Sequence, residues 1–336
     1  MSSSWLINVV LIKNTKTMAK CNTLFIDFNN DIRSNPKKSS LIKSKNNIRG
    51  KIQNYFEKEH PNYTPDFWIQ GSYKMGTLIR TKDNTCDLDY GVYFKSNPDN
   101  VSAETLQTWV KNAVINITND VSHRKKCITV NYKGDYNIDL PVYLFDKEKE
   151  EHPSLAIKGN GFNEDDPQDM VDAFNKKKYS NNQLLRIVRY LKAWCDNKSS
   201  ENGTKMPSGL AMTILAMNNF QSNDDDDIAL KYTLIEIKNS LVSSSSSLFK
   251  CIVPAIPFDN IFEDYSQTKK DFFWNNLSSF IDDAKKAIEE KNQLKASKLW
   301  KKHLGDRFPE GEDKDEKSDI NDIKNIAAKS TPYARR

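Results

Sequence analysis

Two acidic side chains, Asp87 and Asp89, stand one residue apart in the stretch DLDYGVYF, which has the apolar pattern of a β-strand. Because successive side chains of a strand point to opposite faces, both carboxylates are predicted to project from the same face. Two negative charges held so close repel each other unless a positive group lies between them. The pair therefore predicts a cation site, although a D-x-D pattern alone is also typical of a solvated strand end.

A third carboxylate is predicted to join this pair from another strand. In residues 136–145, YNIDLPVYLF, the apolar side chains at even positions form one row, so Asp139 lies on the opposite face. Pro141 favours an edge position or a bulge for this strand, because proline cannot donate a ladder hydrogen bond. Carboxylates are the ligands that Mg²⁺ prefers, and two such ions about 4 Å apart can hold both oxygens of an in-line phosphoryl transfer.

A glycine-serine turn lies just upstream of the acidic pair. Gly71 and Ser72 follow a short expected strand, and a helix is expected to begin near Tyr73. Backbone N–H groups at such a helix start, together with the Ser72 hydroxyl, could hold the phosphates of a nucleoside triphosphate. The turn is not a Walker loop, because no G-K-[ST] triplet follows it.

These motifs, taken in order, resemble those of the nucleotidyltransferases of the DNA polymerase β superfamily. The longer stretches of sequence around these motifs are similar to those of the bacterial cyclic-oligonucleotide synthases. These enzymes are relatives of cyclic GMP–AMP synthase and oligoadenylate synthase and are found in anti-phage defence operons. The resemblance covers roughly residues 40 to 310. It rests on QGSYKMGTLIR, DLDYGVYF, YNIDLPVY, YLKAW, MPSGLAM and W-x-x-x-L-G-D-R-F-P, the last from Trp300 to Pro309.

The resemblance implies roles for the three acids. Asp87 and Asp89 would bind two Mg²⁺ ions, for which Mn²⁺ is a possible substitute. Asp139 would complete the site of the ion that activates the acceptor hydroxyl. Gly71 and Ser72 would hold the donor triphosphate.

On the second half of the chain, the resemblance implies that Lys192 in YLKAW and Ser208 in PSG reach back to the phosphates. Two plainer interpretations stay open: Lys192 as a surface lysine beside an apolar stripe, and Ser208 as a helix cap. Arg186 and Arg189 share a helix edge with Lys192, and either assist it or are solvated.

The implied activity is the cyclisation of nucleoside triphosphates, ATP and GTP or another, into a cyclic di- or trinucleotide second messenger with release of pyrophosphate. An effector encoded in the same defence operon would respond to the product. One alternative is a nucleotidyltransferase that modifies RNA or protein, such as a tailing polymerase or a toxin. Another is an inactive fold that serves as a binding module, which would predict the loss of a metal-binding acid.

The implied fold is α+β. A polymerase β-like nucleotidyltransferase core, with a mixed sheet and helices, precedes a helical C-terminal lobe like that of poly(A) polymerase and oligoadenylate synthase. We expect a disordered leader over residues 1–17, with Met18 as the functional start, and a flexible tail over 311–336. The catalytic lobe would span 18–165 and the helical nucleotide-binding lobe 166–310.

Local patterns predict several of the elements. Helices are expected over residues 39–59, 102–118, 210–220, 228–241 and 266–303, and another begins at Asp166-Pro167. The aspartate run NDDDD at 223–227 and the serines at 243–247 are expected to be solvated loops.

Composition limits the remaining possibilities. Fifty basic against 45 acidic residues give a net charge of +5, which is too even to indicate non-specific DNA binding. The five cysteines are scattered, so neither disulfides nor a zinc thumb for DNA activation is predicted, and a reducing cytoplasm is expected. The apolar run at residues 5–12 is too short to span a bilayer and lacks the basic start of a secretion signal.

Overall fold

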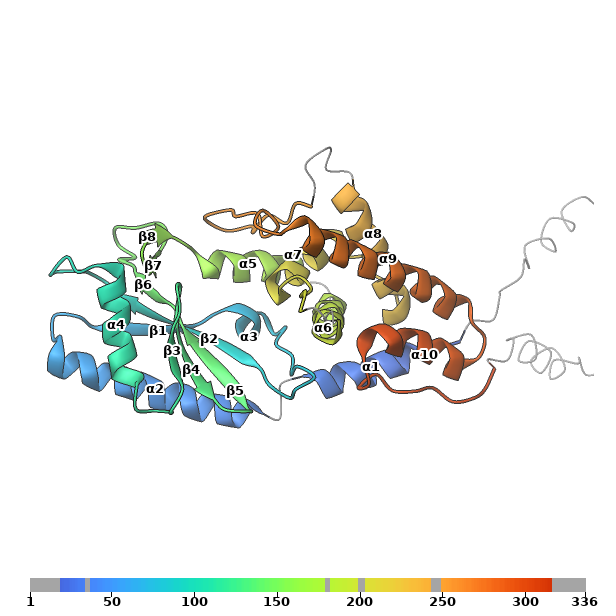
Figure 1. Ribbon diagram of the computed structural model, residues 1–336, viewed down its shortest axis with the longest axis horizontal. Helices are drawn as coiled ribbons and strands as arrows, with labels where there is room; N and C mark the ends of the chain where they lie inside the picture. The colour runs from blue at the N-terminus through green and yellow to red at the C-terminus, as the bar shows by residue number, and fades with distance from the viewer. Residues whose placement is uncertain (1–18, 34–36, 179–181, 199–202, 243–248, 316–336) are drawn as a thin grey trace, which may run out of the picture.

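The computed structural model describes residues 19–33, 37–178, 182–198, 203–242 and 249–315. It shows an α/β half and a helical half lying side by side (Figure 1). The expected leader, Met18 and the serine run lie outside the described residues, as does most of the expected tail.

The α/β half is built on one mixed sheet with β2 near its centre. β2 pairs in parallel with β5 and β6 and antiparallel with β1, and the strand order is β3-β4-β5-β2-β6-β7-β8. The strands are β1 (Pro65–Ile69), β2 (Asp87–Phe94), β3 (Val121–His123), β4 (Ile128–Tyr132), β5 (Tyr136–Leu140), β6 (Val142–Leu144), β7 (Ser154–Ile157) and β8 (Gly161–Glu164). The α+β class implied by the resemblance is confirmed.

The expected edge strand around Pro141 is central instead. β5 and β6 lie along the same side of β2 with one constant register, Asp89 opposite Asp139 and Val92 opposite Val142, so no residue is bulged out. On the side away from β2, β5 pairs with β4, whereas β6 pairs with β7, and this change of neighbour falls at Pro141. The missing N–H of proline therefore falls in a gap of the ladder, while the Pro141 carbonyl accepts from Val92 N.

Two helices cover one face of this sheet. α2 (Lys38–Glu59) and α4 (Ala103–Val114) share a hydrophobic core with the even-numbered residues of β2. Ser102 caps α4, because its side chain accepts from Thr105 N. Asp87 and Asp89 alternate with the core residues, so they lie on the opposite sheet face.

The helical half has its own hydrophobic core. Its helices are α1 (Asn22–Ile32), α5 (Pro167–Lys178), α6 (Asn182–Asn197), α7 (Gly209–Asn219), α8 (Asp226–Val242), α9 (Gln267–Glu289) and α10 (Gln293–Leu304). The helix expected over 266–303 is in fact two, because Asn292 caps α10 by accepting from Lys295 N. α1 precedes the sheet in the chain but packs in this helical core, beside α6 and α8. We propose that the boundary between the catalytic lobe and the helical lobe lies at residue 166, and that α1 belongs to the helical lobe.

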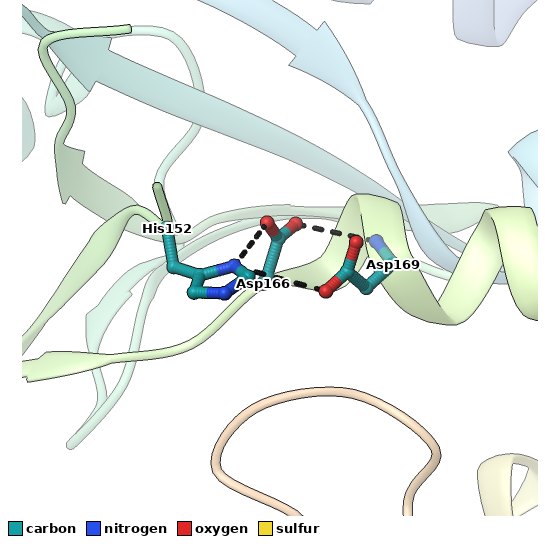
Figure 2. A group of neighbouring side chains, drawn as sticks. All are labelled: His152, Asp166 and Asp169. Atoms are coloured by element: carbon teal, nitrogen blue, oxygen red, sulfur yellow. Dashed lines mark hydrogen bonds and ion pairs between the residues drawn. The ribbon is translucent and has the colours of Figure 1, made fainter. Parts of the chain in front are cut away.

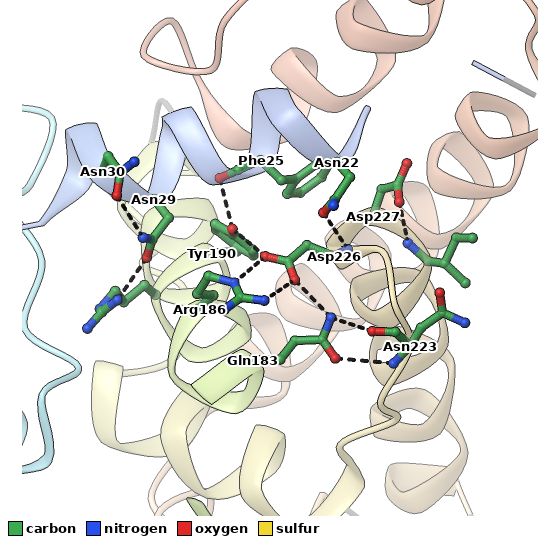
Figure 3. Close-up of polar contacts among 12 residues, drawn as sticks. Asn22, Phe25, Asn29, Asn30, Gln183, Arg186, Tyr190, Asn223, Asp226 and Asp227 are labelled. Atoms are coloured by element: carbon green, nitrogen blue, oxygen red, sulfur yellow. Dashed lines mark hydrogen bonds and ion pairs between the residues drawn. The ribbon is translucent and has the colours of Figure 1, made fainter. Parts of the chain in front are cut away.

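The aspartate run is not simply a solvated loop, as Figure 3 shows. Asp226 is 0% exposed, forms an ion pair with Arg186 (Nε to Oδ2, 2.6 Å) and accepts from the Tyr190 hydroxyl at 2.7 Å. Asp226 and the buried Asp227 form the first turn of α8, where the helix dipole favours negative charge. The prediction therefore failed for these two residues, because the cation that compensates Asp226 comes from a distant helix.

Candidate active site

The structure brings the three predicted acids together. Asp89 lies directly opposite Asp139 on the neighbouring parallel strand, and Asp87 lies opposite Asn137. Asp87 and Asp139 each accept a hydrogen bond from a polar neighbour: Asn137 Nδ2 donates to Asp87 Oδ1 at 2.9 Å, and the Thr129 hydroxyl donates to Asp139. The sheet register thus gathers three carboxylates at one end of β2 and β5.

These carboxylates carry charge that the protein leaves uncompensated. Burial, together with the nearby charges of Asp139 and Asp87, raises the pKa of Asp89 to about 6, against the opposing effect of Lys192. Burial also raises the pKa of Asp139, while the hydrogen bond from Thr129 opposes that shift. Among the described residues, no ion pair involves any of the three. The site therefore favours the arrival of a positive group.

The glycine-serine turn lies against Asp89. Gly71 begins the short helix α3 (Gly71–Met75) with φ +58°, a conformation that L side chains rarely adopt. A Cβ at Gly71 would stand 2.1 Å from Asp89 Oδ2, so only glycine permits this approach. Gln70 N donates to the Asp89 carbonyl at 3.0 Å, and Thr77 N donates to the Ser72 carbonyl at 2.8 Å. The predicted turn is therefore fixed beside the acids.

Lys192 is buried, so its interpretation as a surface lysine is wrong. It is 9% exposed, and its ammonium donates to the Thr77 carbonyl at 3.2 Å and to the Thr77 hydroxyl at 3.1 Å. Burial lowers its pKa to about 8, although the charge of Asp89 opposes the shift. Lys192 thus reaches from α6 to the segment that follows α3.

The two neighbouring arginines hold protein groups rather than facing solvent. Arg186 pairs with Asp226, and buried Arg189 donates to Asn29 and to the Gly76 carbonyl. Ser208 caps α7, because its hydroxyl accepts from Ala211 N at 3.2 Å. The helix-cap interpretation of Ser208 is therefore confirmed, and a contact with phosphate stays a prediction.

Two hollows meet at the acids. Both are lined by Gly71, Asp89 and Asp139. The larger, of about 820 Å³, is also lined by Ser72, Asp87, Lys192 and two further cations that the sequence analysis missed, Lys82 and Lys205. The other, of about 630 Å³, has Gln70, Lys126, Tyr143 and apolar side chains in its wall, together with the acids Asp165, Asp166, Asp259, Glu263 and Asp264. No spacing in the sequence signals Lys82 and Lys205, because they come from two segments far apart in the chain that only the fold brings together.

A second cluster of ligand-type side chains lies at the start of α5 (Figure 2). The nearest ligand atoms of His152, Asp166 and Asp169 lie within 4.8 Å of one another. However, Asp166 Oδ1 accepts from Gln168 N and Asp169 N as a helix cap, and its Oδ2 faces His152 Nδ1 at 3.2 Å. Because Asp166 is occupied and a helix N-terminus disfavours cations, we interpret this cluster as a cap that joins the two lobes.

Comparison with known proteins points to one family. Residues 65–143 match the sequence model of the nucleotidyltransferase domain of cyclic GMP-AMP synthases like DncV. A cyclic GMP-AMP synthase of Escherichia albertii is 27% identical over 191 residues, which are 53% of this chain. The match spans 42% of the length of that relative. None of the described helices is long and apolar enough to cross a membrane.

Solved structures share the fold over most of the chain. The Vibrio cholerae cyclic AMP-GMP synthase DncV, 16% identical, aligns with a TM-score of 0.75 over 86% of this chain and 97% of its own. Another DncV structure, in complex with ATP and GTP, aligns with a TM-score of 0.75 at 15% identity, over 87% of this chain and 97% of its own. The Escherichia coli MS115-1 CdnC:HORMA complex, 18% identical, gives 0.67 over 86% of this chain and 98% of that one.

Proposed function

We infer that this chain, which belongs to the DncV-like family of bacterial nucleotidyltransferases, joins nucleoside triphosphates into a cyclic di- or trinucleotide and releases pyrophosphate. The observation that carries the proposal is the meeting of Asp87, Asp89 and Asp139 beside the Gly71 turn, between two hollows. One hollow would take the donor triphosphate and the other the nucleotide that supplies the attacking hydroxyl.

The acids fit two Mg²⁺ ions. The donor set consists only of carboxylate oxygens, which suit a hard cation. Burial and the neighbouring charges of Asp139 and Asp87 both raise the pKa of Asp89, so a cation bound there would stabilise its ionised form. Asp87 and Asp89 would hold both ions, and Asp139 one of them, with Mn²⁺ as a possible substitute. When bound, such ions activate the attacking hydroxyl and neutralise charge on the leaving group.

The side chains of the larger hollow suit a polyanion. The turn at Gly71 and Ser72 offers backbone N–H groups and a hydroxyl, and Lys82, Lys192 and Lys205 supply positive charge from two lobes. Lys192 already lies within hydrogen-bond distance of Thr77, so its ammonium is held in place before a nucleotide arrives. These groups would hold the donor triphosphate, with its α-phosphorus near the three acids.

The chemical step is a substitution at the α-phosphorus of the donor. A ribose hydroxyl oxygen of the acceptor forms the new bond, and the bond to the β-phosphate breaks, so pyrophosphate leaves. The Asp139 carboxylate, whose pKa is raised by burial, is our candidate to accept the hydroxyl proton. A second such step within the linear product would close the ring.

We further propose ATP and GTP as substrates, because a related fold is solved in complex with both. The product would be a cytoplasmic signal in anti-phage defence, bound by an effector from the same operon. Activation by DNA is not part of the proposal.

The test is to incubate the protein with pairs of labelled triphosphates and Mg²⁺ or Mn²⁺, then treat with phosphatase and identify products by mass spectrometry. We expect a phosphatase-resistant compound with the mass of a cyclic di- or trinucleotide, absent with Asp139→Asn. Label that enters only RNA or protein would instead favour the tailing or toxin alternative. Absence of any nucleotide transfer would contradict the proposal.

A further inference from the structure

The two hollows beside the acids differ in charge. Lys82, Lys192 and Lys205 line the larger hollow, whereas the smaller one has a single cation, Lys126, among its described lining residues. Its wall contains five acids beyond those of the site, contributed by the segment before α5 and by the loop 249–266 between α8 and α9. These are Asp165, Asp166, Asp259, Glu263 and Asp264. Such a wall repels a triphosphate, so the part of a nucleotide that enters there is its base.

Asp165 is the acid of this wall that most needs a partner. Its backbone is fixed, because its N–H donates to the Pro153 carbonyl at 2.9 Å. Its half-buried carboxylate has no hydrogen bond or ion pair among the described residues. Burial raises its pKa to about 6, with Asp259 and Asp166 adding to the shift and Lys126 opposing it. A desolvated acceptor of this kind is costly until it receives donors.

The other acids of the wall are less suited to this role. Asp166 is occupied as the cap of α5 and as the partner of His152. Asp259, Glu263 and Asp264 are exposed on the loop, where water satisfies them. Among these five acids, Asp165 is therefore the half-buried carboxylate that is left to bind a ligand in the hollow.

The rest of the wall suits a flat ring. Tyr143, Met170, Val171 and Ile256 line the hollow, and the apolar side chain of Leu210 is 40% exposed there. An aromatic base would cover this apolar surface while its edge reaches a polar group.

We propose that Asp165 recognises a guanine base of the acceptor nucleotide, an inference that rests on the proposed function. A carboxylate only accepts hydrogen bonds, and it can accept two side by side. On its Watson–Crick edge, guanine offers the adjacent donors N1–H and N2–H, which match the two oxygens. Adenine and cytosine place an acceptor beside their amino group, and uracil places carbonyls on both sides of its N–H. Asp165 would therefore bind guanine and reject the other bases.

Asp165→Asn provides a sharp test, because an amide presents one acceptor and one donor and thus matches adenine. Glu164→Gln is the matched control, since it removes the same charge one residue away and Glu164 does not line this hollow. Binding is measured with analogues of GTP and ATP that carry a methylene between the α- and β-phosphates, which prevents turnover. Products from equimolar ATP and GTP are then compared by mass spectrometry.

For the parent and for Glu164→Gln, we expect at least one site to bind the GTP analogue about tenfold or more tightly than the ATP analogue, and guanosine in the product. Asp165→Asn should lose this preference or reverse it, while it still binds the ATP analogue. An unchanged preference in Asp165→Asn, or a parent product without guanosine, would overturn the assignment of Asp165 and leave the proposed function intact. If the parent binds neither analogue, the proposed function fails and the inference falls with it.

Discussion

Asp89 and Asp139 face each other across two adjacent parallel strands, in the same register and on the same side of the sheet. The backbone ladder fixes this arrangement, so the two carboxylates cannot move apart without disturbing β2 or β5. Burial, together with the charges of Asp139 and Asp87, raises the pKa of Asp89 to about 6. The fold therefore holds a strained charge pair that a cation would relieve.

Replacing Asp89 with Asn should abolish nucleotide transfer and stabilise the metal-free protein. In the folded state the pKa of Asp89 lies above its usual value, so its ionisation at neutral pH favours unfolding, by up to about 3 kcal/mol. Urea unfolding in chelator at pH 7 measures the change, with Asp27→Asn on the exposed face of α1 as control. Mg²⁺ with nucleotide should raise the melting temperature of the parent and barely move that of Asp89→Asn. A marked loss of stability in chelator would show that Asp89 is structural.

Much of this site could be predicted from local sequence, because local rules govern its parts. Alternation along a strand places Asp87 and Asp89 on one face, and the apolar row of residues 138–144 places Asp139 on the matching face. The turn at Gly71 was predictable from the glycine-serine pair before a helix. What alternation could not give is the register, which sets Asp89 opposite Asp139.

Long-range contacts explain the predictions that failed. Local pattern assigned Asp226 to solvent and left a surface position open for Lys192, yet both side chains contact partners more than 35 positions away in the chain. Pro141 is tolerated inside the sheet because the neighbouring strand changes from β4 to β7 at this residue, so no ladder hydrogen bond requires its missing N–H. The acidic wall around Asp165 combines two distant loops, so no window of sequence contains it.

Replacing Lys192 with Met should weaken triphosphate binding far more than it weakens the fold. Methionine keeps an unbranched stem in the buried space but removes the ammonium that reaches Thr77 and the larger hollow. Removing a buried charge offsets part of the lost hydrogen bonding, so the free energy of unfolding should change by only about 1–2 kcal/mol. We expect KM for the donor nucleotide to rise about tenfold or more, with Lys285→Met on the exposed face of α9 as control. Equal KM values for the Lys192→Met variant and the parent would exclude a phosphate contact.

Replacing Arg186 with Leu should destabilise the helical lobe strongly, because it leaves the fully buried Asp226 without its cation (Figure 3). Loss of one partner of a buried ion pair typically costs about 3–5 kcal/mol. Adding Asp226→Asn should recover part of the loss, since the unpaired charge is then removed. Chemical unfolding of both variants measures this coupling, and KM for nucleotide should be unchanged in protein that remains folded. If Asp226→Asn recovers none of the stability that Arg186→Leu loses, or if Arg186→Leu only raises KM, a role for Arg186 at the triphosphate is favoured.

His303 of α10 is buried against α9, and its titration should make the stability of the protein depend on pH. His303 Nε2 lies 2.9 Å from Asp283 Oδ2, and its ring stacks on Phe280. Burial lowers the pKa of His303 to about 4, against the opposing effect of the hydrogen bond that His303 donates to Asp283. Because the unfolded state has the ordinary pKa near 6.5, it takes up the proton first as pH falls. Stability should therefore be lost between about pH 6.5 and 4, by up to about 3 kcal/mol from this group.

His303→Gln isolates this effect, since glutamine can still donate to Asp283 but does not titrate. It should be less stable than the parent at pH 7, because the ring stack on Phe280 is lost, yet its stability should fall less steeply toward pH 4.5. His152→Gln is the control of opposite sign: the hydrogen bond with Asp166 raises the pKa of His152, so protonation there favours the folded state and its removal should steepen the fall. Urea unfolding at pH 7, 5.5 and 4.5 measures all three proteins. If the free energy of unfolding falls equally with pH for the parent and for His303→Gln, His303 does not govern the acid sensitivity of the helical lobe.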